Sequence, residues 1–155
     1  MTTHQKTLED FQLHERVGYK LSRLSKLMQA MVEAGLAQHN ISRMQWCVLA
    51  GVDIENHSSP SALADYMRVS RPAISRVLKN MEMEQLIERD IIGDDGRTRL
   101  LTVTEKGRKK IEAGWVHFKS TEAHFLAKLN AEQLAVLHAT IQIMIDGENA
   151  ELDDL

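Results

Sequence analysis

Two closely spaced helix-start signals constrain the fold of this chain most. In the first, Ser59 can cap a helix and Pro60 takes the first helical position, where its missing N–H costs nothing. This helix is expected to end near Met67, and Ser70 caps a second helix after a three-residue connection. A connection this short holds the two helices together, so the sequence predicts a helix-turn-helix.

The second helix of this pair has an apolar side and a polar side. Its expected buried residues are Ile74, Val77, Leu78 and Met81. The residues left at its first turn or on its other side are Ser70, Arg71, Pro72, Ala73, Ser75, Arg76 and Lys79. A small, hydroxylated and cationic face can approach base edges and phosphates closely, so we expect these residues to contact DNA. Ser59 and Ser61 are expected to join them. The alternative is an ordinary solvated helix face.

β-Prone residues follow this helix on both sides of a turn at 93–96, which predicts one β-hairpin. One interpretation is that this segment is only a turn. The turn then explains Gly96, and its acidic side chains cap backbone N–H groups. An arginine at a loop tip can, however, enter a narrow minor groove while a carboxylate orients its guanidinium. We therefore expect Arg97 to contact DNA with help from Asp95, and Arg99 to form a salt bridge.

Long amphipathic segments lie at both ends of the chain. Apolar residues recur at heptad-like spacing between Leu8 and Leu36, at Val17, Leu21, Leu24, Met28 and Met31, and again after Thr104, at Ile111, Trp115, Phe118, Phe125 and Leu129. Ser42 is a possible cap for a short helix, and Asn130 with Gln133 resembles a capping box for a terminal helix. The acidic tail from Gly147 is expected to fray.

The expected fold is therefore mainly α with one β-hairpin wing: a winged helix-turn-helix between N- and C-terminal dimerisation helices. We assign residues 1–41 to the first dimerisation helix, 42–104 to the winged unit, and 105–155 to the last helices and the tail. A chain of 155 residues with 43% hydrophobic residues can bury all of this in one compact domain.

The charge is unevenly divided along the chain. The total is −3, but Ser58 to Lys110 holds eleven Lys and Arg against eight Asp and Glu, whereas the rest holds eight against fourteen. A basic middle between acidic flanks suits a domain that presents one face to phosphates. The modest excess would not identify DNA binding unaided.

Composition and motifs argue against a membrane protein, a metal-binding protein and an enzyme. The single cysteine, Cys47, cannot form an internal disulfide, and no run is apolar enough to cross a bilayer, so we expect a cytoplasmic protein without a membrane partner. His117 and His124 are two turns apart on one helix without a third ligand, so no metal site is expected. Without a phosphate loop or nucleophile motif, we expect neither a cofactor nor enzymatic activity.

A small-molecule pocket is a second candidate site. Met28, Trp46, Cys47 and Trp115 could line an effector cavity, although aromatic residues and methionines at helical spacing are more often core. Cys47 lies beside Val48 on an apolar helix face and has no obvious cation near it in sequence. It is therefore expected to be a structural thiol and not an oxidant sensor.

Four segments together resemble the MarR family of bacterial transcription regulators. They read SALADYMRVSRPAISR at 61–76, LIER at 86–89, DGR at 95–97 and LTVTEKG at 101–107. The spacing of Arg89, Asp95 and Arg97 is similar to the wing signature of that family, with Arg89 in a supporting role. The resemblance runs from about residue 10 to 147.

The resemblance implies a homodimer on a pseudo-palindromic, double-stranded operator. The base-reading positions of the family fall on Ser70 to Arg76, and its wing-tip arginine falls on Arg97. Family members commonly repress, and many release DNA when a small phenolic or otherwise lipophilic acid binds between the dimer helices and the reading domain. Two alternatives stay open: a winged-helix module that binds proteins, and a DNA-binding regulator without an effector.

One position departs from the family pattern. Gln85 stands where the family often has glycine after the reading helix. A glutamine in a left-handed cap costs about 1 kcal/mol, so the helix is expected to end differently here.

Overall fold

The computed structural model describes residues 11–92 and 98–152 of the chain. Its elements are the 3-10 turn η2 (Leu13–Glu15), the helices α1 (Val17–Ala37), α2 (Arg43–Asp53), α3 (Pro60–Met67), α4 (Arg71–Met83), α5 (Glu105–Leu126) and α6 (Ala131–Ile145), and the strands β1 (Ile87–Ile92) and β2 (Thr98–Val103). The expected fold class, mainly helical with one antiparallel hairpin, is confirmed.

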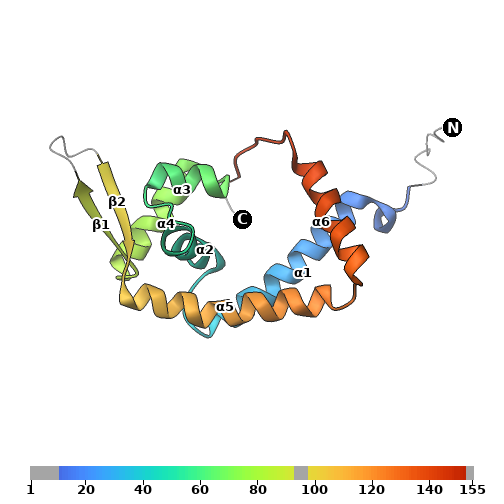
Figure 1. The fold of residues 1–155 in the computed structure, drawn as a ribbon, viewed down its shortest axis with the longest axis horizontal. Helices are drawn as coiled ribbons and strands as arrows, with labels where there is room; N and C mark the ends of the chain where they lie inside the picture. The colour runs from blue at the N-terminus through green and yellow to red at the C-terminus, as the bar shows by residue number, and fades with distance from the viewer. Residues whose placement is uncertain (1–10, 93–97, 153–155) are drawn as a thin grey trace.

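The helices form two groups joined by α5 (Figure 1). At one end, α2, α3, α4 and the hairpin form a winged unit in which α3 and α4 pack against each other. At the other end, α1 runs alongside α5 and α6 turns back above them. The long helix α5 therefore connects the winged unit to the end of the molecule that holds α1 and α6.

Side-chain caps set most of the helix starts. Ser59 accepts a hydrogen bond from the backbone N–H of Ala62 at 3.2 Å, as the sequence predicted. Capping boxes start α2 at Ser42 with Gln45 and α6 at Asn130 with Gln133. These local signals confirm the expected order of helices.

Two helix starts differ from expectation. Ser70 lies at the N-cap position of α4, but its side chain makes no capping hydrogen bond to that helix. The first long helix begins at Val17 and not near Leu8, because Arg16 has an extended backbone that separates α1 from the 3-10 turn.

The expectation that the acidic tail frays is wrong as far as Leu152. Its N–H donates to the carbonyl of Arg68 at 2.9 Å, and its carbonyl accepts from the N–H of Ser70 at 2.8 Å. Leu152 thereby forms a parallel β-bridge with Val69, which lies between those two residues. The connection between α3 and α4 offers a backbone donor and acceptor outside any helix, and one extended residue of the tail satisfies both.

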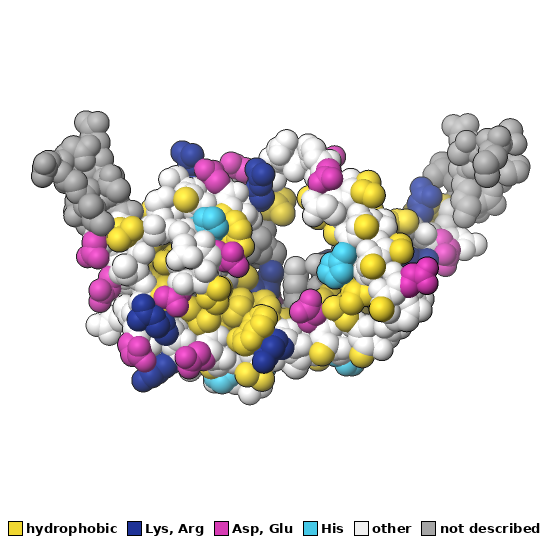
Figure 2. All heavy atoms as spheres, viewed as in Figure 1, with side chains coloured by type: hydrophobic (Ala, Val, Ile, Leu, Met, Phe, Trp, Pro, Cys, Tyr) yellow, Lys and Arg dark blue, Asp and Glu magenta, His cyan; other side chains and the backbone are white. Residues whose placement is uncertain are grey.

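The core lies where α2, α3, α4 and the hairpin meet α5 and the last turns of α1. Its most deeply buried side chains are Leu36, Val48, Leu49, Leu63, Val69, Ile74, Leu78, Met81, Leu86 and Leu101. Leu63 and Met67 face inward as expected. Figure 2 shows further hydrophobic side chains gathered at the surface where the winged unit meets α5, with charged side chains at their edge.

Glycine at position 114 is required for the close approach of α2 and α5. A Cβ there would overlap the indole of Trp46 and the side chain of Leu36. We expect Gly114→Ala to lower the free energy of unfolding by about 1–3 kcal/mol, because the overlap outweighs the gain in helix propensity. Urea denaturation at a fixed protein concentration measures this change.

Gly18→Ala is the matched control, since a Cβ at Gly18 meets nothing within 4 Å. It should leave stability unchanged or raise it by up to about 1 kcal/mol. If both alanine variants had the same midpoint of urea denaturation, the overlap expected at position 114 would not destabilise the protein.

Candidate nucleic-acid interface

One side of α4 is exposed to solvent, and the connection from α3 sets its direction. Arg68 takes a left-handed conformation with φ of 54°, which turns the chain sharply at the end of α3. The exposed residues along the presented side are Arg71, Pro72, Ser75, Arg76 and Lys79, and Ser70 at the N-cap is half-buried. The structure therefore brings together most of the residues that the sequence assigned to this face.

Ala73 is the exception on α4. The sequence analysis placed it on the exposed face, but its side chain is only 4% exposed. It lies one helical turn before the half-buried Val77, so it widens the apolar stripe that packs into the core. The first turn of α4 therefore offers fewer side chains to solvent than the sequence suggested.

Two serines extend the polar face onto α3. Ser61 is exposed, and its Oγ lies 3.4 Å from the Oγ of Ser59. The hydroxyl of Ser59 caps α3, and Ser59 itself is half-buried. Of the two serines, only Ser61 is exposed.

The hairpin is joined to α4 by an ion pair. The Nε of Arg89 on β1 lies 3.0 Å from Oε1 of Glu82, and both side chains are at least partly shielded from water. Sequence reasoning gave Arg89 a supporting role but missed Glu82, which is an ordinary helix residue by its local pattern. The backbone of Arg99 pairs with Ile91 across the strands. Asp95 and Arg97 lie outside the described residues.

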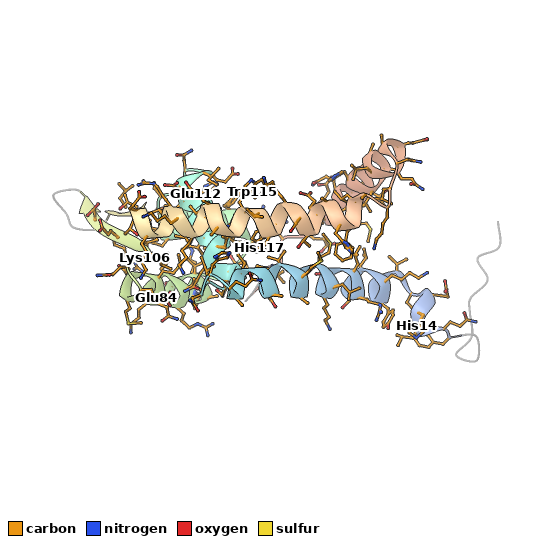
Figure 3. The ribbon with its side chains drawn as sticks, turned by 90° about the horizontal axis from the view of Figure 1, so that it is seen from below. His14, Glu84, Lys106, Glu112, Trp115 and His117 are labelled. Atoms are coloured by element: carbon orange, nitrogen blue, oxygen red, sulfur yellow. The ribbon has the colours of Figure 1, made fainter. Side chains whose placement is uncertain are left out.

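The chain enters β1 through a left-handed residue, so the expectation that α4 ends differently at Gln85 is wrong. Gln85 has φ of 59°, and the N–H of Leu86 donates to the carbonyl of Met81 at 2.9 Å. Further bonds hold this junction: the hydroxyl of Thr104 donates to the carbonyl of Gln85 at 2.8 Å, and Lys106 Nζ donates to the carbonyl of Glu84 at 2.7 Å (Figure 3). The tertiary contacts outweigh the local strain.

A cavity of about 750 Å³ lies between α2, α3 and α5. Its described lining residues are Trp46, Cys47, Ala50, Gly51, Ile54, Glu55, Tyr66, Met67, Ile111, Glu112 and Trp115. Three of the four expected pocket residues are among them. Met28 is not, because α1 contributes no described residue to the lining.

Trp46 forms the back of this cavity. Its Nε1 donates to the carbonyl of Ile111 at 3.0 Å, and its ring stacks on Phe118 at 4.0 Å between centroids. Trp115 lies nearly parallel to it at 6.3 Å and is 48% exposed. Figure 3 shows Trp115 and Glu112 on the side of α5 that faces away from α1. Trp46 therefore packs into the core and Trp115 borders the cavity, while an effector in this cavity stays a prediction.

Other kinds of site find no support in the described part of the chain. It holds no group of three or more His, Cys, Asp or Glu side chains that could bind a metal ion. No helix within residues 11–92 and 98–152 is long and apolar enough to span a membrane.

A helix-turn-helix followed by an anchored β-hairpin is a winged helix-turn-helix. The model of the MarR family matches residues 39–98, which include α2, α3, α4 and β1. Over these residues the chain resembles the MarR family.

Solved structures with a similar fold include MarR-family regulators with and without ligands. A DNA complex of MepR from S. aureus matches with a TM-score of 0.78 and 22% identity over 86% of this chain and 97% of that one. A mutant MarR from E. coli with operator DNA matches with a TM-score of 0.76 and 18% identity over 83% and 93%. BpsR from Bordetella bronchiseptica, whose DNA binding is regulated by 6-hydroxynicotinic acid, matches with a TM-score of 0.79 and 17% identity over 89% and 99%. At these identities the likeness establishes the fold.

Because a left-handed backbone favours glycine, we expect Gln85→Gly to raise the free energy of unfolding by about 0.5–1 kcal/mol. The bonds to this junction use the Gln85 carbonyl, which glycine keeps. The midpoint of urea denaturation measures the gain.

Gln38→Gly is the control at another helix end. Gln38 follows α1 with φ of −62°, so glycine relieves nothing there and should leave stability equal or lower. A Gln85→Gly protein no more stable than wild type would mean that the left-handed turn carries no strain.

Proposed function

We propose that the chain is a homodimeric transcription regulator that binds double-stranded DNA through α4 and its neighbours. The exposed polar face of α4 carries this proposal. It offers the hydroxyl group of Ser75 and the cations of Arg71, Arg76 and Lys79 on the second helix of a helix-turn-helix. In this class of protein that helix enters the major groove, and arginine can pair two acceptors of guanine.

The wing extends the proposed contact to the neighbouring groove. Arg97, oriented by Asp95, is the proposed minor-groove contact, and Arg99 supports the hairpin. The ion pair between Arg89 and Glu82 joins the hairpin to α4, the proposed reading helix. Ser61 and Ser59, at the start of α3, are proposed to lie near the same DNA.

A second copy of the chain is the proposed partner of α1 and α6. Both helices expose large apolar side chains in the single chain, namely Val17, Leu21, Leu24, Leu27 and Met31 on α1 and Val136, Ile141, Ile143, Met144 and Ile145 on α6. Burial of such strips against a copy is favourable at about 25 cal/mol per Å². Two reading helices related by a two-fold axis then fit a pseudo-palindromic operator.

The cavity supports regulation by a small molecule. It is lined both by α3, which belongs to the reading unit, and by α5, which leads to the proposed dimer helices. A ligand that prefers one arrangement of these helices shifts the balance between DNA-binding and released forms. We propose repression that such a ligand relieves, in a cytoplasmic protein without enzymatic activity. Residues 1–41 and 105–155 form the dimer region and 42–104 the reading unit.

One observation favours another function. The net charge of −3 is unusual for a DNA-binding protein, and a winged helix can serve as a protein-interaction module. Charge reversal at the reading helix separates the two functions, because Arg71→Glu should abolish DNA affinity and leave the fold intact. Unchanged DNA affinity would favour the module.

Arg76→Ala should weaken binding to the preferred operator by about 1–3 kcal/mol if the guanidinium contacts a base. Fluorescence anisotropy with labelled duplexes from upstream of its own gene measures this, at two salt concentrations. Lys109→Ala, an equal loss of charge at an exposed site on α5, is the control and should cost less than about 0.5 kcal/mol. Equal losses for both variants would indicate non-specific attraction only.

Leu24→Glu should raise the dimer dissociation constant by about tenfold or more, because burying a carboxylate in an apolar interface is costly. Lys26→Glu introduces the same group two residues further along α1, on the opposite side of the helix, and should have a much smaller effect. Sedimentation equilibrium over a range of concentrations measures both. A Leu24→Glu protein that dimerises like wild type would place the interface elsewhere.

A further inference from the structure

The effector pocket differs in its charge from what the family resemblance implies. The resemblance points to a lipophilic acid, whereas the pocket carries two carboxylates. We propose that this pocket binds a lipophilic organic cation, such as a quaternary ammonium or phosphonium ion with aromatic groups. This inference rests on the proposed function, in which the cavity holds the effector, and names the charge of the ligand.

The walls of the cavity favour a bulky apolar body. Trp46, Tyr66 and Trp115 supply aromatic faces, and Ile54 and Ile111 supply aliphatic ones. A cavity of about 750 Å³ lies in the range that holds drug-sized ligands. The shape and the apolar lining of the cavity do not discriminate between a cation, an acid and a neutral molecule. The charged lining residues therefore determine which of them binds best.

The charged lining residues are Glu55, just after α2, and Glu112 on α5. Neither an arginine nor a lysine is among the described residues that line the cavity. Two carboxylates beside an apolar cavity attract a cation and repel an acid, and because both side chains are exposed, water partly screens this effect. Within residues 11–92 and 98–152, neither carboxylate forms a hydrogen bond or a salt bridge.

The aromatic walls add a second attraction for a cation. A tryptophan face is the best of the aromatic faces for binding positive charge. Lys119 already uses this property, since its Nζ lies 5.7 Å from the centroid of a Trp115 ring. Lys119 therefore lies beside an aromatic residue of the cavity and could hold an acid, so the test includes it.

Two ions of the same shape and opposite charge test the proposal: tetraphenylphosphonium and tetraphenylborate. Both tryptophans of the chain line the cavity, so intrinsic fluorescence excited at the red edge reports on the pocket alone. We expect saturable quenching by tetraphenylphosphonium at lower concentrations than by tetraphenylborate. Added salt should weaken the binding of the cation.

Neutral variants locate the charge. Glu112→Gln and Glu55→Gln should each weaken tetraphenylphosphonium binding by about threefold to tenfold, as expected for a partly screened charge a few ångströms away. Glu122→Gln, an exposed position further along α5, is the control and should leave the affinity unchanged. Lys119→Gln should leave the affinity for tetraphenylphosphonium unchanged or raise it. Thermal unfolding of each variant checks that the fold is intact.

Several outcomes would overturn the inference: tighter binding of tetraphenylborate, binding of neither ion, unchanged affinity in both pocket variants, or an acid site that disappears with Lys119→Gln. Operator binding is measured separately by anisotropy. If the variants bind operator normally while cation preference is absent, only this inference fails. If cation preference is present and no duplex is bound in a sequence-dependent way, the proposed function fails and the charge of the pocket still stands.

Discussion

The indole of Trp46 joins the reading unit to the rest of the molecule. It donates to a carbonyl of α5, stacks on Phe118 and occupies the space that Gly114 leaves open. A bulky ring held by a hydrogen bond, a stacked neighbour and a close helix approach has little freedom to shift. The angle between α2 and α5 depends on it, and with that angle the distance between α4 and the helices that are proposed to pair with a second copy.

The same ring also bounds the cavity, which gives one group of residues two roles. The face of Trp46 toward Phe118 belongs to the core, while its neighbour Trp115 remains half open to solvent. A ligand bound in this cavity, as proposed, would press directly on the contact that sets the relative position of the winged unit and α5. This is a physical route from an occupied pocket to altered spacing of two reading helices, without a change inside the winged unit.

Much of the fold was predictable because its signals are local. Ser59 with Pro60, and Asn130 with Gln133, start helices through bonds that span three residues, and such patterns can be read from sequence. The errors have tertiary causes. Gln85 keeps a left-handed turn because bonds from distant residues hold it, Ala73 is buried because the apolar stripe of α4 is wider than its large residues indicate, and Leu152 pairs with a segment more than eighty residues away.

The same distinction between local and tertiary causes applies to the candidate site. The polar residues of α4 follow from helical spacing, whereas the ion pair of Arg89 with Glu82 and the two carboxylates of the cavity depend on how elements pack. Sequence spacing alone gives no sign that Glu55 and Glu112 border one cavity.

The tail contact has a practical consequence for work on this protein. Leu152 is bonded to the connection that precedes α4, so this part of the tail lies beside the proposed reading face, whereas α1 begins at the other end of the molecule (Figure 1). An affinity tag fused to the chain shortly after Leu152 would be held close to this contact. An acidic tag there would compete with nucleic acid for the reading face, and a polyhistidine tag would attract nucleic acid. Binding constants are better measured with the tag on the N-terminal side or removed.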